Sequence, residues 1–388
     1  MRIEAFRNLQ HEAVVWRHYL HENPELDYRM HNTARFVIEK LASFGIDRIE
    51  TGIAEAGIVA LIQGEDGNQP TIGLRADMDA LPILEVPNKR WSSNIPGKMH
   101  ACGHDGHIAM LLGAAKYLAN TRNFKGSVAL IFQPAEEVGL PSGGLRMVQE
   151  GIMDRFGIHQ VFGMHNLPGI EVGKFGICDG PIMASQDDFD IVVKGRGGHA
   201  AAPHQAIDPV VIAAHIIVGL QTLVSRNTNP MEPLAISVTK LKAAEAYNVI
   251  PDQVEMGGTV RTLVPGLREF AERQILATAQ GIARGFGADL DLKHRRAVPV
   301  TFNDTNGTNL AIKAASNLVG PASVDVKIKP RMGSEDFAYM LEARPGAFIF
   351  LGNGATAGLH HPAYDFNDEA LPFGIGYWVN LVEIVLAA

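Results

Sequence analysis

The sequence has little cysteine, no long hydrophobic run and no excess of positive charge. Its 388 residues include only two cysteines, Cys102 and Cys178, which excludes a fold built on disulfides. The most apolar stretch, residues 209–224, is interrupted by His215 and Gln221, so we expect no membrane span. Lysine and arginine total 34 against 42 aspartates and glutamates, a net charge of −8. This charge argues against nucleic acid or an anionic membrane as a partner.

The first 25 residues carry scattered charges where a secretory signal would need an uninterrupted apolar segment. We therefore expect a cytoplasmic protein. In a reducing compartment, a ligand or catalytic role for a cysteine is favoured over a disulfide bridge. The length is sufficient for two or three domains.

Apolar runs that alternate with helical patterns predict a mostly parallel, mixed α/β sheet flanked by helices. The expected strands cover residues 57–63, 71–77, 127–133, 161–166, 324–329 and 347–352. The expected helices cover residues 3–20, 33–44, 105–119, 143–150, 308–318 and 369–386, and a further helix is opened by Ser334 and Glu335.

Residues 184–297 have a different pattern, because their strands alternate polar and apolar residues. The expected order is strand, helix, strand, strand, helix, strand, which is the ferredoxin-like β-α-β-β-α-β arrangement of an α+β domain. We therefore predict that this domain is inserted into one α/β domain made of residues 1–183 and 298–388.

Side chains that bind metals follow three successive strands of the predicted sheet. They are His100, Cys102, His104, Asp105 and His107 after the second strand, the pair Glu136 and Glu137 after the third, and His165 at the fourth, with His360 and His361 near the C-terminus. A single histidine or a pair of glutamates is usually structural or solvated. Ligands that follow three strands of one sheet meet at its carboxyl edge, however, and this coincidence predicts a metal site.

The type of these side chains indicates a catalytic metal site. A thiolate, imidazoles and a carboxylate suit Zn²⁺, Mn²⁺, Co²⁺ or Ni²⁺, and the CxxC pairs of structural zinc sites are absent. Of two adjacent carboxylates, one can hold the metal while the other accepts a proton from water, which predicts hydrolysis. A dinucleotide fingerprint, a P-loop and a GxSxG motif are all missing.

Nine motifs, in order along nearly the whole chain, resemble the M20 metallopeptidase family. They are LRADMDALP, MHACGHDGH, FQPAEE, GMHNLP, KGRGGHAAAPH, NVIPD, GTVRT, GSEDFAYML and LHHPAYDFND. The nearest branch contains N-acyl-amino-acid amidohydrolases, hippurate hydrolases and auxin-conjugate hydrolases. The resemblance implies two divalent metal ions bridged by Cys102, with His104, Glu137, His165 and His360 as the other ligands and Glu136 as general base. His360 is preferred to His361 as the metal ligand, because His361 occupies a position where this branch usually has asparagine or serine.

The resemblance also implies that residues 184–297 pair two subunits, in a homodimer or a dimer of dimers, and close over the catalytic domain as a lid. His199 would then stabilise the oxyanion in the partner's active site, and Asn248 and Arg261 would hold the substrate carboxylate. The sequence departs from the family at EEVGLPSGG, where Pro141 and Ser142 lengthen a loop beside the metal ligands. Because of this departure, the resemblance does not determine the shape of the pocket for the acyl group.

These observations predict a metal-dependent amidohydrolase that cleaves N-acyl amino acids, either hippurate-like or N-acetylated, to a carboxylic acid and a free amino acid. A dipeptidase or aminopeptidase of the same family is the alternative, and it would need an acidic group to hold the free amine of its substrate. A third hypothesis is a non-catalytic binding protein on the same scaffold, and the presence of Glu136 argues against it.

Overall fold

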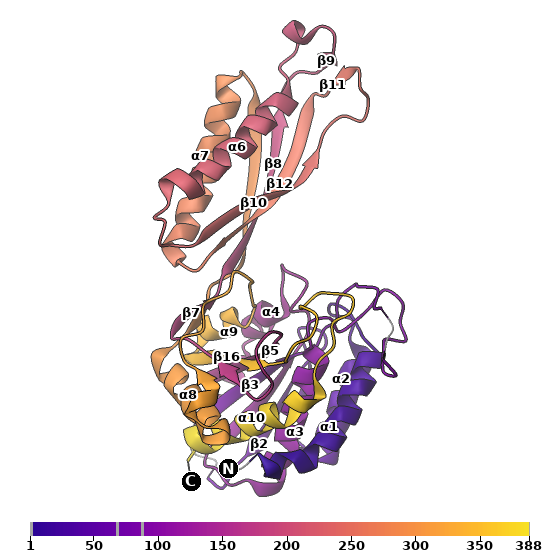
Figure 1. The fold of residues 1–388 in the computed structure, drawn as a ribbon, viewed down its shortest axis with the longest axis vertical. Helices are drawn as coiled ribbons and strands as arrows, with labels where there is room; N and C mark the ends of the chain where they lie inside the picture. The colour runs from indigo at the N-terminus through magenta and orange to yellow at the C-terminus, as the bar shows by residue number, and fades with distance from the viewer. Residues whose placement is uncertain (1–2, 67–69, 87–88, 388) are drawn as a thin grey trace. The chain divides into compact units, whose positions relative to one another are not determined.

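The fold is described from a computed structural model, which covers residues 3–66, 70–86 and 89–387 (Figure 1). Its internal contacts divide the chain into two compact units. The second unit comprises Met183–Val300 and Pro330–Glu335, and the first comprises the remaining described residues. The predicted insertion, residues 184–297, lies within the second unit, which also takes in Pro330–Glu335, a segment that we had expected in the other domain.

The first unit is built on an eight-stranded sheet. Its strands are β1 (Ile49–Ile53), β2 (Gly57–Gln63), β3 (Thr71–Asp77), β4 (Ser127–Gln133), β5 (Ile158–Leu167), β6 (Phe175–Gly176), β15 (Val324–Asp325) and β16 (Gly346–Gly352). They lie in the order β1-β2-β4-β3-β5-β16-β6-β15. The central strands β4, β3, β5 and β16 are parallel, whereas β1 and β2 at one edge are antiparallel to their neighbours. The predicted α/β class with a mostly parallel sheet is confirmed.

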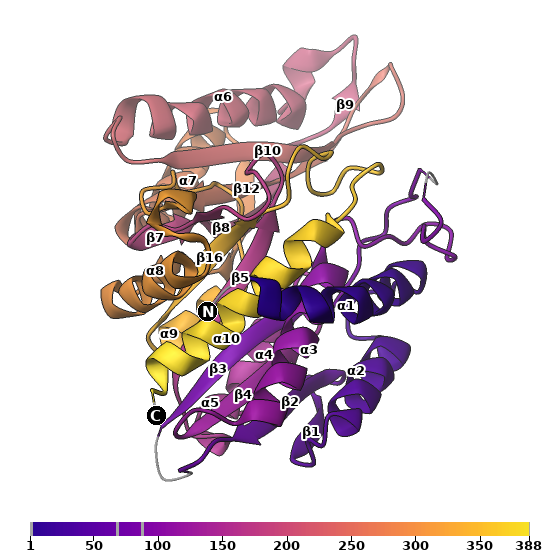
Figure 2. The ribbon, with the colours of Figure 1, turned by 60° about the horizontal axis from the view of Figure 1, so that its bottom comes forward.

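Helices cover both faces of this sheet (Figure 2). Packed together on one face are α1 (Glu4–Glu22), α2 (His31–Ser43), α3 (His104–Thr121), α8 (Thr305–Val319) and α10 (Leu371–Val385). On the other are the shorter helices α4 (Gly143–Gln149), α5 (Ile152–Arg155) and α9 (Ala338–Ala343). Both faces of β3 and β4 are buried along their whole length. The larger core, which contains the side chains of Leu74, Phe162 and Trp378, thus holds these two strands at the centre of the sheet.

The structure differs from the predicted elements at several places. Strand β1 was not expected, because its sequence contains glycine and most of it stays partly exposed. The strand expected at 324–329 is only two residues long, since its partner β6 offers only two residues for pairing. The helix expected to open at Ser334 begins at Ala338 instead, because Ser334 and Asp336 use their side chains in tertiary hydrogen bonds.

The second unit is an antiparallel sheet with two helices. Its main elements are β8 (Ser185–Lys194), α6 (Pro209–Asn227), β10 (Leu234–Lys242), β12 (Gln253–Thr262), α7 (Pro265–Gly285) and β13 (Asp289–Val298). The strand order β10-β12-β8-β13 is that of a ferredoxin-like unit, as predicted. One short pair completes the strands of this unit, β9 (Gly198–His199) with β11 (Val249–Ile250). A second short pair, β7 (Gly180–Met183) with β14 (Thr301–Asn303), belongs to the first unit except for Met183.

One helix of the described chain, α6, is long and apolar enough to cross a membrane by length and composition alone. Its Ile212, Ile216 and Leu220 are buried in the core of the second unit, together with Ile275 of α7. Packing against the sheet therefore accounts for the apolar side chains on that face of the helix.

Candidate metal centre

The carboxyl edge of the large sheet brings the candidate ligands together within the first unit. Asp77 ends β3, Glu136 and Glu137 follow β4, and His165 lies near the end of β5. Helix α3 begins at His104, directly after Gly103 in the left-handed region at φ 91°. A Cβ on Gly103 would lie 2.4 Å from the Asn166 side-chain oxygen, so only glycine allows the turn between Cys102 and His104.

Two histidines use one ring nitrogen for the backbone and leave the other for a metal. The Nδ1 atom of His104 donates to the carbonyl of Asp79 at 2.8 Å, and Nδ1 of His165 donates to the carbonyl of Asn166 at 2.6 Å. The Nε2 atom of His104 is then buried without a hydrogen-bond partner, at 3.5 Å from Oδ2 of Asp77. The Nε2 atom of His165 lies 3.4 Å from Sγ of Cys102. A backbone carbonyl on Nδ1 is the usual device that orients a histidine ligand, so both rings fit a metal.

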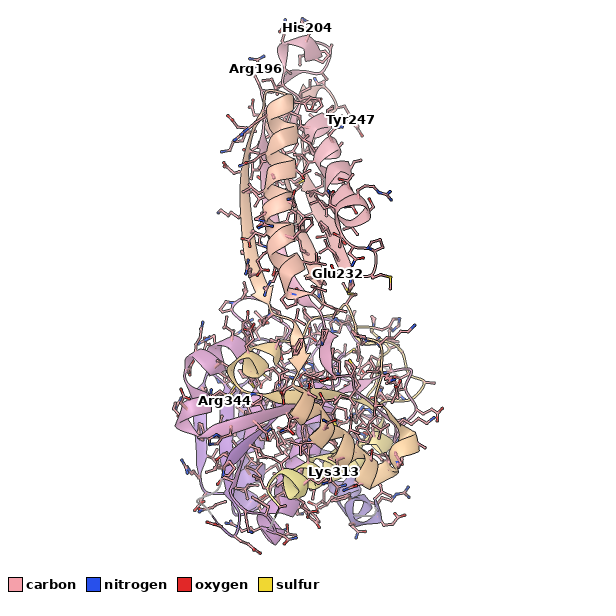
Figure 3. The ribbon with its side chains drawn as sticks, turned by 90° about the vertical axis from the view of Figure 1, so that its left-hand side faces the viewer. Arg196, His204, Glu232, Tyr247, Lys313 and Arg344 are labelled. Carbon is pink, nitrogen blue, oxygen red and sulfur yellow. The ribbon has the colours of Figure 1, made fainter. Side chains whose placement is uncertain are left out.

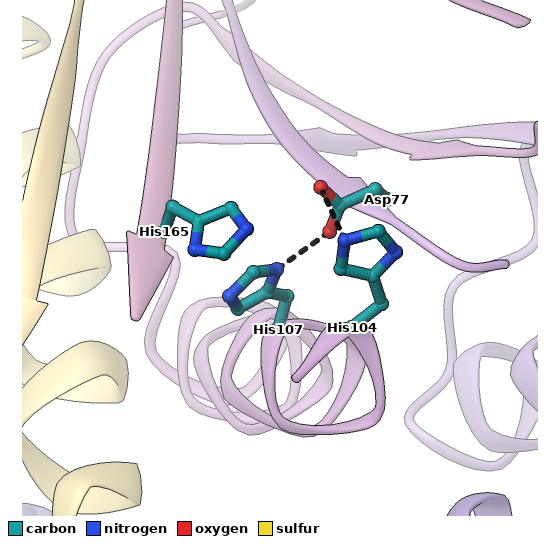
Figure 4. A group of neighbouring side chains, drawn as sticks. All are labelled: Asp77, His104, His107 and His165. Atoms are coloured by element: carbon teal, nitrogen blue, oxygen red, sulfur yellow. Dashed lines mark hydrogen bonds and ion pairs between the residues drawn. The ribbon is translucent and has the colours of Figure 1, made fainter. Parts of the chain in front are cut away.

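His107 lies in the same group but has both nitrogens engaged (Figure 4). Its Nδ1 atom contacts Oδ1 of Asp77 at 2.6 Å, and its Nε2 atom contacts the side-chain oxygen of Asn166 at 2.7 Å. Asp77 in turn accepts from Arg75 at 2.8 Å. This arrangement assigns His107 to orienting its neighbours rather than to holding an ion.

A second group joins Cys102, Glu137 and His360, whose donor atoms all lie within 4.8 Å of one another. Nε2 of His360 is 3.1 Å from Oε1 of Glu137. His360 has φ 63°, a conformation that is unfavourable for a residue with a side chain and that clusters at functional sites. The neighbouring His361 instead accepts a hydrogen bond from the backbone of Ala363 at 3.0 Å, within its own loop.

Asp79 fixes the pair of glutamates through the backbone. Its two carboxylate oxygens accept the N–H groups of Glu136 and Glu137, each at 3.0 Å, and its side chain is buried. The preceding Ala135 has φ 53°, which turns the chain sharply after β4. Donor atoms of Glu136, Glu137 and His104 also lie within 4.8 Å of one another. Both glutamates are therefore held at the cluster of ligands.

The electrostatics of the cluster fit a cation. Burial, together with the charges of Glu137, Glu136 and Asp77, raises the pKa of Cys102 well above its usual value. Burial opposes the charged form of His104, but Asp77 and Asp79 outweigh it and raise the pKa of His104 to about 10. Burial also acts to raise the pKa of Glu137, yet His360 and His104 lower it. A divalent ion would stabilise this buried negative charge and the thiolate.

The lengthened loop between β4 and α4 is anchored at both ends. The N–H of Gly143 donates to the carbonyl of Ala135 at 3.0 Å, and the Tyr28 hydroxyl donates to the carbonyl of Pro141. Ser142 caps α4 with its side chain. The loop leaves the apolar side chain of Leu140 exposed, three residues after Glu137.

His199 and Asn248 lie together in the second unit. His199 ends β9, which pairs with β11, and Asn248 directly precedes β11. The N–H of Ala200 donates to the carbonyl of Asn248 at 3.0 Å, and both His199 and Asn248 line a cavity of about 470 Å³. The N–H of Ala201 donates to Nδ1 of His199 at 3.0 Å, so Nε2 of this exposed ring carries the proton and is a donor. Figure 3 labels Tyr247, next to Asn248, at the end of this unit that carries β9 and β11.

Arg261 lies on β12 and is not among the residues that line this cavity. It donates hydrogen bonds to Gln186 and Ser334 of the second unit. The structure thus brings Cys102, His104, Glu136, Glu137, His165 and His360 together in the first unit, and places His199, Asn248 and Arg261 in the second. The individual roles of these residues stay predictions.

Sequence reasoning did not assign roles to Asp77, Asp79 or Asn166, and it named His107 only as one of several candidate ligands. The signal for the two aspartates was present in LRADMDALP, since two acids at and just after the end of a buried strand are unusual. What the sequence could not show is that both oxygens of Asp79 receive the N–H groups of residues that follow a different strand.

Comparison with known proteins identifies the family. A sequence model of Peptidase family M20/M25/M40 matches residues 73–384. An N-acetylcysteine deacetylase of Bacillus subtilis is 41% identical over 375 residues, 96% of each chain. A hippurate hydrolase of Campylobacter jejuni is 40% identical over 379 residues, 98% of each chain. The crystal structure of the Bacillus subtilis YXEP protein, a dinuclear metal binding peptidase from the M20 family, matches with a TM-score of 0.86 and 36% identity, covering 98% of this chain and 99% of that one.

These relatives confirm the predicted resemblance and the predicted enzyme class, a metal-dependent amidohydrolase. They also support the prediction of two divalent metal ions. The chain therefore belongs to Peptidase family M20/M25/M40.

Proposed function

We propose that the enzyme hydrolyses the amide bond of N-acyl amino acids and releases a carboxylic acid and a free amino acid. The observation that carries the proposal is the pair Glu136 and Glu137, fixed side by side on Asp79 at a cluster of metal-binding side chains. One carboxylate of such a pair is available as a base while the other holds the metal. The deacetylase and the hippurate hydrolase with about 40% identity support N-acyl amino acids as the substrate class.

In this proposal the two ions would be held by Cys102, as their shared ligand, and by His104, Glu137, His165 and His360. The ions are Zn²⁺, Mn²⁺, Co²⁺ or Ni²⁺, which this mixture of sulfur, nitrogen and oxygen donors suits. When bound, they would supply Lewis-acid activation of the amide carbonyl and of the attacking water.

The chain's own residues would then move the protons and hold the substrate. Glu136 accepts a proton from the attacking water and returns it to the nitrogen of the leaving amine. The protonated Nε2 of His199 donates a hydrogen bond to the oxyanion that forms at the carbonyl carbon. Asn248 and Arg261 bind the carboxylate of the amino-acid part of the substrate.

Assembly and location complete the proposal. Residues 1–183 and 298–388 form the metal-binding catalytic domain, and residues 184–297 form a lid that pairs two subunits in a homodimer or a dimer of dimers. His199 serves the active site of the partner. The substrate is a small molecule, with neither nucleic acid nor a membrane as partner. The enzyme works in the cytoplasm, where a reducing environment keeps Cys102 available to metal.

A panel of substrates tests the proposal. The protein is loaded with Zn²⁺, Mn²⁺, Co²⁺ or Ni²⁺ and incubated with benzoylglycine, N-acetyl amino acids or unblocked dipeptides, and the products are identified by mass spectrometry. We expect benzoate and acetate together with free amino acids. Cleavage of the unblocked dipeptides alone would instead assign the chain as a dipeptidase or aminopeptidase, and no turnover with any loaded metal would favour a binding protein.

A further inference from the structure

Arg261 takes part in a closed ring of hydrogen bonds in the second unit. Its Nη2 donates to Oε1 of Gln186 at 3.0 Å, and its Nη1 donates to the hydroxyl of Ser334 at 3.1 Å. The Ser334 hydroxyl donates to the same Oε1 of Gln186 at 2.9 Å. Arg261 and Gln186 are direct partners across the β12–β8 pairing. The guanidinium is therefore fixed in orientation by two neutral acceptors.

A carboxylate lies close by but is kept apart from the guanidinium. Asp188 follows Gln186 by two residues on β8, on the same face of the strand. Nε2 of Gln186 donates to Oδ1 of Asp188 at 3.3 Å, which turns Oε1 of the same amide toward Arg261. Among the described residues, no carboxylate oxygen lies within ion-pair distance of Arg261. Gln186 thus bridges Arg261 and Asp188, with one end of its amide bonded to each.

The charge balance agrees with this geometry. Burial lowers the pKa of Arg261, and the charge of Asp188 acts in the opposite direction. A half-buried guanidinium that is bonded only to neutral oxygens retains most of its attraction for an incoming carboxylate. A direct pair with Asp188 would remove that attraction.

We infer that Gln186 is a positioning residue that orients Arg261 and keeps it from pairing with Asp188, so that the guanidinium stays available for the substrate carboxylate. The inference rests on the proposed function, in which Arg261 binds that carboxylate. Ser334 is the second support of the same guanidinium. Selectivity for acyl amino acids over their uncharged amides therefore depends on a neutral side chain at position 186.

The test compares benzoylglycine with benzoylglycinamide, which lacks the free carboxylate, by measuring benzoate release from the metal-loaded enzyme. Gln186→Glu places a carboxylate directly on Arg261. It should raise KM for benzoylglycine about 10- to 100-fold, the scale of a lost charge-assisted hydrogen-bond pair. It should leave kcat for benzoylglycine within about threefold of the wild-type value, and KM for the amide within about twofold of the wild-type value. Gln253→Glu, which adds the same charge at an exposed position of β12, is the matched control.

A second pair of variants separates positioning from folding. Gln186→Leu removes the spacer and frees Arg261 to pair with Asp188, so KM for benzoylglycine should again rise about 10-fold or more. Adding Asp188→Asn to Gln186→Leu should reverse at least half of the increase in KM for benzoylglycine, on a logarithmic scale, because the competing carboxylate is gone. A structural defect at position 186 would not be repaired by this second substitution.

Three results would overturn the inference. Equal losses for the acid and the amide would show that Gln186 supports folding alone, and unchanged kinetics in Gln186→Glu would show that it has no effect on Arg261. If Arg261→Ala itself leaves the ratio of acid to amide turnover unchanged, the proposed carboxylate anchor fails together with the inference. The first two results would leave the proposed role of Arg261 intact. Failure of the inference about Gln186 can therefore be distinguished from failure of the proposed function.

Discussion

Sγ of Cys102 lies 3.4 Å from Nε2 of His165, although the thiol precedes helix α3 and the histidine lies on strand β5. The contact forms because both segments reach the carboxyl edge of one sheet. It places a buried thiol, which has a raised pKa when no cation is near, against an imidazole nitrogen that is free to bind metal. The chemistry proposed for the centre depends on this contact and on the grouping of Cys102 with Glu137 and His360.

Cys102 should be protected from alkylation by bound metal. A thiolate that bridges two cations is both deprotonated and shielded, so removal of the metal by a chelator should increase the rate of its modification by iodoacetamide. The rate is measured by peptide mass spectrometry, and the half-buried Cys178 is the internal control. Equal modification of Cys102 with and without metal, in protein whose metal content is verified, would refute its role as bridging ligand.

Asp79→Asn should weaken both stability and metal binding. An amide can accept only one of the two backbone N–H groups that the carboxylate now receives, so a buried donor loses its partner. We expect a loss of about 1–3 kcal/mol in the free energy of unfolding and roughly 10- to 100-fold weaker metal binding. Asp291→Asn, which breaks an exposed ion pair with Lys194, is the control and should change neither. Unaltered metal affinity in Asp79→Asn would contradict its role in positioning the glutamates.

His21 should make stability depend on pH. Burial acts to lower the pKa of this histidine, but Asp105, whose Oδ2 is 2.8 Å from its Nδ1, raises it to about 9. Because the folded value exceeds the unfolded value of about 6.5, the stabilisation is complete below pH 6.5 and is lost as pH rises through about 9. The Tm difference between wild type and His21→Gln should therefore be larger at pH 6 than at pH 9.5. The same difference at both pH values would show that the ring is neutral in the folded state.

His199 should act on the partner subunit. A Glu136→Gln subunit and a His199→Ala subunit are each expected to be nearly inactive, since loss of one oxyanion donor costs about 10²- to 10³-fold in kcat. A mixed dimer would contain one site with both groups intact, so mixing should restore activity. Verified mixed dimers without any recovery would assign His199 to its own subunit.

Much of the fold follows from periodicity in the sequence. The apolar runs of β2, β3 and β4 and the helical pattern of α3 predict those elements closely, because each is buried against the same core. The short edge strands β1 and β15 bury few side chains, so their sequences carry a weak pattern.

The candidate site could be predicted only in part. Residue type and position after successive strands identified a wider set of candidates that includes Cys102, His104, His107, Glu137 and His165. The resemblance to the M20 family then selected the ligands among them. The hydrogen bonds that decide between His104 and His107 as a ligand depend on which neighbours each ring nitrogen meets, and no spacing in the sequence shows this. Gln186 escaped notice for a similar reason, since its partners Arg261 and Ser334 lie far away along the chain.

The most direct test of the account measures benzoylglycine hydrolysis and bound metal together in wild type, Glu136→Gln and Glu137→Gln. If Glu136 is the base and Glu137 a ligand, Glu136→Gln should keep its full metal content and lose about 10²- to 10⁴-fold in kcat. Glu137→Gln should lose metal and activity together. Wild-type protein that is fully loaded with metal yet releases no benzoate or acetate from any acyl amino acid, or equal metal loss in both variants, would contradict the account.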